Sequence, residues 1–201
     1  MIVYVESNFV LELAFLREEH QQCEVILSLA ESRDIDLALP AFSIGEPYEA
    51  LERRLKQREE LYRRLRAEIR ELARSKPYQE PTQRFQELTD LLLKSIEEEK
   101  RRLDEALARV LSIAQVIPID LDTIRAALTF QNSRNLSAQD SIVYASILTH
   151  LAGAGPGPHC FITKNSRDFV NPDIKNDLMI YKCRLLTAFS NGLGYIRSGL
   201  S

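Results

Sequence analysis

Residues 47–114 constrain the fold of this chain more than any other stretch. They contain no glycine, and Leu, Glu, Arg and Lys dominate their composition. Apolar residues recur at spacings of three, four and seven, which is typical of amphipathic helices that pair along a coiled-coil-like seam. Pro77 and Pro81 interrupt the pattern, so we expect an antiparallel hairpin with arms on the order of 40 Å long. The apolar positions are Leu51, Leu55, Tyr62, Leu65, Ile69 and Leu72, then Phe85, Leu88, Leu92, Ile96, Leu103, Leu107 and Val110.

The two arms of this hairpin differ in charge. Lys and Arg outnumber Glu between residues 53 and 76, whereas Asp and Glu outnumber Lys and Arg between residues 84 and 105. One interpretation is that opposite charges flank a single intramolecular seam. The other is that the basic arm lies along a phosphate backbone, with Arg63, Arg64 and Arg70 as candidate nucleic-acid contacts.

Outside this stretch, short apolar runs alternate with helical patterns. This alternation predicts an α/β fold in which helices cover both faces of a parallel sheet. A single helix is expected from about residue 8 to residue 33. Strands are expected at residues 2–5, 36–40, 116–119, 160–163 and 179–181, with a closing helix near residues 185–189.

Composition narrows the class of protein. The 201 residues suffice for one domain with an elaboration. The three cysteines, Cys23, Cys160 and Cys183, follow neither a disulfide nor a zinc pattern and fit a reducing cytosol. No apolar run approaches the roughly 18 residues that span a bilayer, and Glu6 interrupts the first apolar run. We therefore expect a cytoplasmic protein without a membrane segment.

Acidic and amide side chains follow several of the expected strands. Glu6 ends the first, Glu46 follows the second, and Asn165 and Asp168 follow the strand that ends at residue 163, while Asp140 begins a helix. The carboxyl ends of parallel strands share one edge of a sheet, where ligands usually bind. Carboxylates gathered there repel one another unless a cation lies between them. Ligand sets of oxygen alone favour Mg²⁺ or Mn²⁺.

Each of these acids also has a structural interpretation. Ser43 is placed to cap a helix with Glu46 as its partner, and Ser137 with Asp140 forms the same kind of capping box. Glu6 is less easily explained in this way, because a carboxylate at the end of a buried strand needs a partner.

Four segments together resemble the PIN domain family, whose members include the VapC-like metal-dependent ribonucleases. They are Val5-Glu6-Ser7-Asn8, Glu46, residues 136–145, and Ile162-Thr163-Lys164-Asn165-Ser166-Arg167-Asp168-Phe169. The resemblance covers about residues 1–50 and 115–190. The hairpin, residues 50–115, lies outside it as an insertion within a single PIN-like domain spanning residues 1–201.

The resemblance implies a small parallel sheet in an α/β/α sandwich and a divalent-metal nuclease that acts on RNA. Many relatives are toxins of toxin–antitoxin pairs and form dimers, so an antitoxin partner and a homodimer are implied as well. Glu6, Asp140 and Asp168 would bind Mg²⁺ or Mn²⁺, and Glu46 would complete the catalytic set or orient the attacking water. Asn8, Thr163 and Asn165 would support them.

Two positions depart from the family pattern. The first acidic position is usually Asp, and Glu6 is one methylene longer. Asn165 stands where some relatives have an acid. Two hypotheses therefore remain: an active endoribonuclease that leaves a 5′-phosphate, or a degenerate module that binds protein or RNA through its hairpin.

Overall fold

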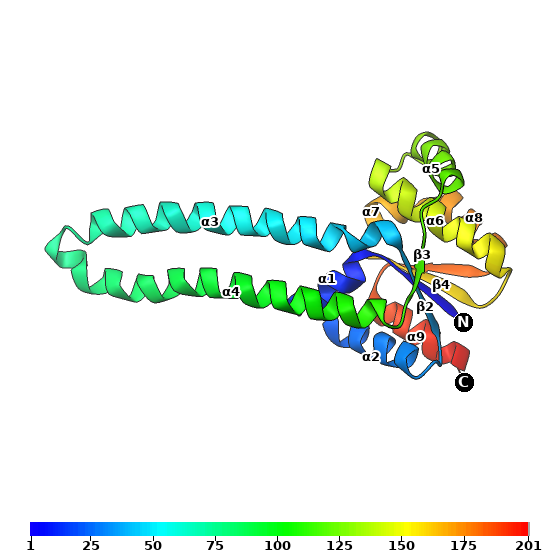
Figure 1. The fold of residues 1–201 in the computed structure, drawn as a ribbon, viewed down its shortest axis with the longest axis horizontal. Coiled ribbons are helices and arrows are strands. Elements are labelled where there is room, and N and C mark those ends of the chain that lie inside the picture. The colour runs from blue at the N-terminus through cyan, green and yellow to red at the C-terminus, as the bar shows by residue number, and fades with distance from the viewer. Residues whose placement is uncertain (201) are drawn as a thin grey trace.

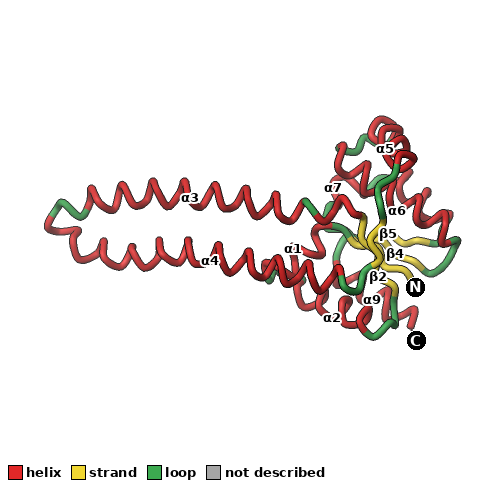
Figure 2. The backbone as a smooth tube through the Cα atoms, viewed as in Figure 1, coloured by secondary structure: helices red, strands yellow, loops and turns green. Residues whose placement is uncertain are grey.

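Five parallel strands form one sheet in the order β3-β2-β1-β4-β5. Figure 2 shows the strands gathered between two groups of helices. This computed structural model describes residues 1–200, except for the side chains of residues 81, 83, 84, 86, 87, 89, 90 and 93. The predicted α/β class with a small parallel sheet is confirmed. The strands are β1 (Ile2–Val5), β2 (Asp36–Pro40), β3 (Gln115–Ile117), β4 (His159–Ile162) and β5 (Cys183–Leu186).

Helices cover both faces of the sheet. Val3 and Val5 of β1 pack on one face and Tyr4 on the other, because successive side chains of a strand point in opposite directions. The first face contacts α1 (Ser7–Phe15), α2 (His20–Glu31) and α9 (Phe189–Leu200). The second contacts α6 (Ala138–Ala154), α7 (Ser166–Phe169) and α8 (Pro172–Ile180), and α5 (Leu121–Ser133) packs on α6.

The expected hairpin consists of α3 (Glu46–Leu72) and α4 (Gln79–Leu111), which project from the sandwich in Figure 1. A short 3-10 turn, η2 (Lys76–Tyr78), joins the arms, and another, η1 (Ala41–Ile44), precedes them. Pro77 lies in the predicted break, whereas Pro81 lies in the first turn of α4. A proline there removes no hydrogen bond, because the first N–H groups of a helix have no partner within it.

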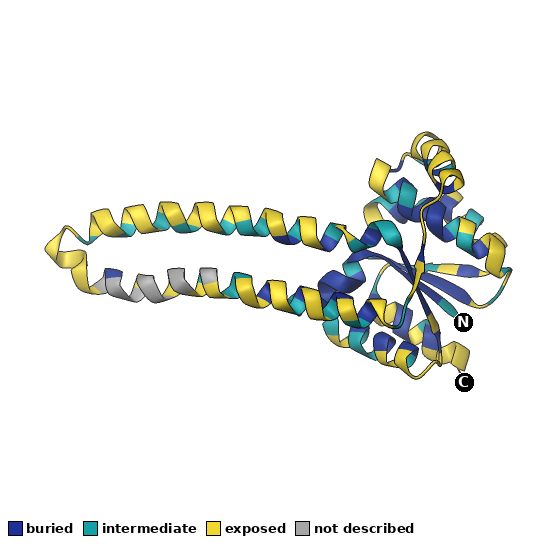
Figure 3. Cartoon of the chain, viewed as in Figure 1, coloured by how far each residue is buried: buried dark blue, intermediate teal, exposed yellow. Residues whose placement is uncertain are grey.

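Apolar packing anchors only the base of the hairpin. Leu51 of α3 and Leu103 and Leu107 of α4 form a buried cluster with Val10 and Ala14 of α1. Figure 3 shows that the outer face of α3 remains exposed beyond this base. The cluster fixes the start of α3 against α1, close to the end of β1.

Further along the hairpin the seam differs from the expected apolar one. Glu99 is buried in it, and Arg58 donates hydrogen bonds to Glu99 (2.8 Å) and Ser95 (3.0 Å). The expectation that apolar positions continue the seam is wrong at the far end, where large side chains face solvent. Leu72, Phe85 and Leu88 are 48%, 54% and 59% exposed.

Two boundaries predicted in the sandwich are also wrong. The single helix expected over residues 8–33 is divided into α1 and α2, because Leu16 adopts a left-handed conformation (φ 48°) and ends α1. No glycine or proline marks this break in the sequence.

The strand expected at residues 179–181 is the end of α8, where Ile174 and Leu178 are buried one turn apart. The last strand is β5, and α9 begins at Phe189, after the predicted closing helix. Lys182, with φ 53°, separates α8 from β5. The apolar residues Met179 and Ile180 are exposed at the helix end, so their apolar character misled the prediction.

Two expectations from composition concern the molecule as a whole. Within residues 1–200, no helix has both the length and the apolar character needed to cross a bilayer. The three cysteines are free and buried, and burial raises the pKa of Cys160 to about 12.

Candidate active site

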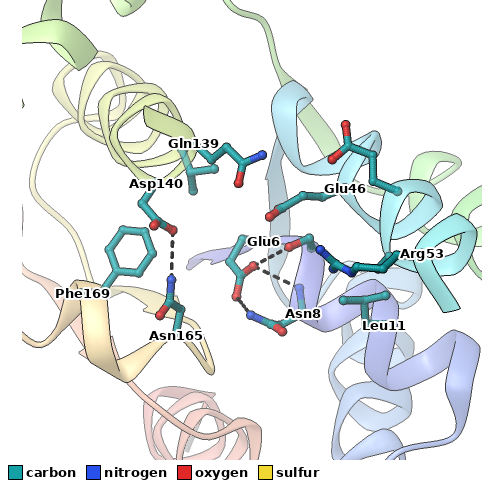
Figure 4. Close-up of a pocket in the computed structure, with 13 residues that line it drawn as sticks. Glu6, Asn8, Leu11, Glu46, Arg53, Gln139, Asp140, Asn165 and Phe169 are labelled. Carbon is teal, nitrogen blue, oxygen red and sulfur yellow. Dashed lines mark hydrogen bonds between the residues drawn. The ribbon is translucent and has the colours of Figure 1, made fainter. Parts of the chain in front are cut away.

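A polar pocket of about 230 Å³ lies at the carboxyl-end edge of the sheet (Figure 4). Its walls come from α1, α3, α6 and the segment after β4, so residues far apart in sequence meet there. This is the edge at which the sequence predicted an acidic site. The pocket includes five predicted residues, namely Glu6, Asn8, Glu46, Asp140 and Asn165.

Glu6 is buried at the point where β1 becomes α1. It is the N-cap of α1, and its carboxylate accepts hydrogen bonds from the Asn8 backbone N–H (3.0 Å) and the Ser7 hydroxyl (2.8 Å). Its other oxygen accepts from the Asn8 side-chain amide (2.7 Å) and the Thr163 hydroxyl (3.0 Å). A carboxylate has about four acceptor positions, so these donors engage Glu6 fully. A buried carboxylate needs polar partners, and these four hydrogen bonds supply them for Glu6.

Asp140 faces Glu6 from the first turn of α6. Half of the predicted capping box is present, since the Ser137 hydroxyl accepts the Asp140 backbone N–H (3.1 Å). Within the described residues, the Asp140 carboxylate accepts the Ser137 hydroxyl (2.5 Å) instead of the Ser137 backbone N–H. Asn165 donates its side-chain amide to the other Asp140 oxygen (3.0 Å). Burial raises the pKa of Asp140, the negative charge of Asp168 adds to the rise, and the hydrogen bonds from Ser137 and Asn165 oppose it. Asp140 is therefore both a cap residue and a wall of the pocket.

Glu46 enters the pocket as the first residue of α3. The capping role predicted for Ser43 is wrong, because Gly45 occupies the N-cap position and Ser43 is buried within η1. Burial raises the pKa of Glu46, a hydrogen bond with Ser7 opposes the rise, and the neighbouring negative charges of Glu6 and Asp140 add to it. The helix that begins the hairpin thus supplies one acid of the site.

Two predicted site residues lie just outside the pocket lining. Thr163 is fully buried beneath it, where it donates to Glu6 and accepts the Asn165 backbone N–H (2.9 Å). Asp168 lies in α7, close enough to Asp140 to raise its pKa, but it is not one of the lining residues. Within the described part of the chain, no group of three or more acidic, His or Cys side chains is arranged to hold a metal ion.

Sequence reasoning missed four polar lining residues. Glu49 and Arg53 lie three and seven residues after Glu46, so they occupy the same face of α3. That helical spacing is the signal that could have found them. The spacing gave no such indication for Ser7 and Gln139, which neighbour predicted acids in the sequence.

The predicted nucleic-acid contacts lie further along α3. Arg63 and Arg64 form exposed ion pairs with Glu59 and Glu60, one helical turn away. From Glu46, Arg70 is 24 residues along the helix, about 36 Å at 1.5 Å per residue. These arginines are therefore remote from the pocket.

Comparison with known proteins identifies the family. A family model described as a PIN domain matches residues 3–169. The chain belongs to the PIN domain family. This membership indicates a nuclease-type function that acts on nucleic acid. No curated protein and no solved structure matches the chain.

PIN domain nucleases typically use divalent metal ions, and the pocket of this PIN domain can be tested against that chemistry. Its acids offer only oxygen ligands, as hard cations prefer. Asp140 accepts one hydrogen bond at each carboxylate oxygen, so it keeps acceptor positions free. Glu46 shares the pocket and is partly buried. The carboxylate oxygens of Glu46 and Asp140 therefore suit a hard cation, whereas hydrogen bonds already occupy the carboxylate oxygens of Glu6.

Proposed function

We propose that this PIN domain is an Mg²⁺- or Mn²⁺-dependent endoribonuclease. The observation that carries the proposal is the pocket itself, where Glu6, Glu46 and Asp140 come from three separate elements and face one another. A bound cation would supply an activated water and stabilise charge on the leaving oxygen of a phosphodiester. The products would carry a 5′-phosphate and a 3′-hydroxyl.

Individual roles follow from how each carboxylate is held. Asp140 and Glu46 would hold the cation, because both keep acceptor positions free. Asp168, which lies near Asp140, would complete the coordination shell of the cation. Glu6 would position α1 and Asn8 through its hydrogen bonds, and its charge would favour a cation in the pocket. Asn165 would orient Asp140 through its amide.

Cleavage of a labelled RNA during an Mg²⁺ or Mn²⁺ titration tests this function. The full chain should cleave only with added metal, and Asp140→Asn should reduce the rate at least a hundredfold, since the substitution removes a ligand charge but keeps the shape. Asp34→Asn, an exposed change after α2 and away from the pocket, serves as the control. Metal-independent cleavage, or equal rates for the chain and Asp140→Asn, would exclude the proposal.

The saturation of Glu6 favours a second function. If the family's first acid serves only as a helix cap here, the domain binds RNA or protein without cleaving. The hairpin, as an insertion in a single domain, would then provide the binding surface, including Arg63, Arg64 and Arg70. Charge reversal of these three arginines should weaken RNA binding without changing the melting temperature. RNA binding without cleavage at any metal concentration would select this function.

The toxin role belongs to the same proposal and rests on the family resemblance. Its expected partners are an antitoxin protein and a second copy of the chain, in the cytoplasm. Expression of the wild type should arrest growth, and Asp140→Asn should relieve the arrest. Equal toxicity of the two chains would contradict a role that depends on cleavage.

A further inference from the structure

Arg53 is a cation in a pocket of carboxylates, yet its side chain has no partner among the described residues. It lines the pocket together with Glu6, Glu46 and Glu49, and Figure 4 shows its side chain directed inward from α3. Arg53 makes no hydrogen bond or ion pair with any residue that the structure describes. By contrast, Arg54, the next residue, lies within 3.6 Å of Glu99 and over the ring of Phe15. The fold uses Arg54 for packing and leaves Arg53 available.

The orientation of α3 explains why Arg53 faces the pocket. An α-helix has 3.6 residues per turn, so positions separated by seven residues lie on one face. Glu46, Glu49 and Arg53 form this face, while Leu51 and Arg58 lie on the opposite side, against α4. The burial of Leu51 against α1 and α4 fixes the rotation of the helix. The position of Arg53 is therefore set by the base of the hairpin.

We propose that Arg53 binds a backbone phosphate of the RNA next to the carboxylates, as a substrate-positioning residue. This inference rests on the proposed ribonuclease function. A guanidinium group suits a phosphate because it can donate two parallel hydrogen bonds to its oxygens. The carboxylates of Glu6, Glu46 and Asp140 repel an anionic backbone wherever no bound cation neutralises them. Arg53 supplies the one pocket-lining charge of opposite sign within the described residues.

The same face of α3 gives the bound strand a direction. Arg64 lies eighteen residues after Glu46, five helical turns, and therefore continues the face that carries Arg53, where it pairs with Glu60. A phosphate would have to displace Glu60 to reach Arg64. The rise from Arg53 to Arg64 is about 16 Å, a span of a few nucleotides. Arg63 and Arg70 point to other sides of the helix. The strand would leave the pocket along α3, with Arg53 as its first contact.

The test measures RNA binding in a chain that cannot cleave. Fluorescence anisotropy of a labelled single-stranded RNA is recorded with the full chain carrying Asp140→Asn, over a range of salt concentrations. Adding Arg53→Ala should weaken binding about tenfold and lower the salt-dependence slope by about 0.7, the value for one phosphate contact on a single strand. Arg53→Lys should keep the slope, because it keeps the charge. A purely structural role would not move the slope.

Arg101→Ala is the matched control. Arg101 is an exposed arginine of α4 whose ion pair with Glu105 resembles those of α3, and it lies on the other arm. Its substitution should leave both affinity and slope unchanged. Wild-type affinity and slope for Arg53→Ala would overturn the inference, as would an equal loss for Arg101→Ala. If the wild-type chain fails to cleave RNA with added metal while binding still depends on Arg53, only the nuclease function is refuted.

Discussion

Replacing Glu6 with Ala separates its structural role from any catalytic one. The substitution removes the N-cap of α1, a loss worth about 1 kcal/mol. It also leaves the fully buried Thr163 hydroxyl without its acceptor, which costs about 1–3 kcal/mol. We therefore expect the free energy of unfolding to fall by about 2–4 kcal/mol. For a chain of this length, the melting temperature should fall by on the order of 10 °C.

The assay is urea unfolding followed by circular dichroism in metal-free buffer, so that no bound cation contributes. Glu49→Ala is the control, because Glu49 lines the same pocket but is exposed, and its side chain forms no hydrogen bond with the described residues. Glu6→Gln should lie between the two, since its amide oxygen can still cap α1. Equal unfolding midpoints for Glu6→Ala and Glu49→Ala would refute the argument that hydrogen bonding saturates Glu6.

Three further predictions concern charge in and around the site. Because the pKa of Glu46 is raised in the folded state, its charged form costs stability above that pKa and costs nothing below the ordinary value of 4.5. Glu46→Gln should thus be more stable than wild type at pH 8 in urea unfolding, with the difference vanishing toward pH 4; a constant difference would contradict this. Lys164→Ala should destabilise the chain by about 1–3 kcal/mol, because Glu12 is 1% exposed and Lys164 bonds to it at 2.9 Å. A loss no larger than that of the exposed Lys175→Ala would argue against this. Asn165→Asp adds a charge beside Asp140, so Mn²⁺ should raise its melting temperature more than that of wild type; an equal rise would show that residue 165 lies outside the metal's reach.

The edge of the sheet was the most predictable part of the site. In a parallel sheet, the residues that follow each strand must meet at one edge, so the sequence alone predicts that Glu6, Glu46 and Asn165 lie together. The capping motif that begins at Ser137 likewise placed Asp140 in the first turn of a helix. Local pattern and topology were sufficient for these positions.

Other features were not visible because they depend on contacts between distant segments. Leu16 ends α1 in a left-handed conformation without a glycine to signal it. The Glu12 carbonyl accepts the N–H groups of Leu16 and Arg17 there, and the Glu12 carboxylate accepts the Glu19 N–H. The choice between α8 and β5 also required the tertiary structure. Residues 179–181 and 183–186 are both apolar enough for a strand, and only pairing with β4 selects the second.

The sequence by itself determined that this chain forms a parallel α/β sheet with a long helical hairpin and an acidic carboxyl edge. Periodicity and the alternation of strands with helices along the chain are local properties, so they can be read from the residues in turn, whereas the order of the strands in the sheet depends on pairing between distant segments. Only the tertiary structure decided how each side chain is used. Thr163, 157 residues away, completes the hydrogen bonding of Glu6, and the docking of Leu51 turns Arg53 toward the acids. Such roles depend on distances between segments, which no local pattern contains.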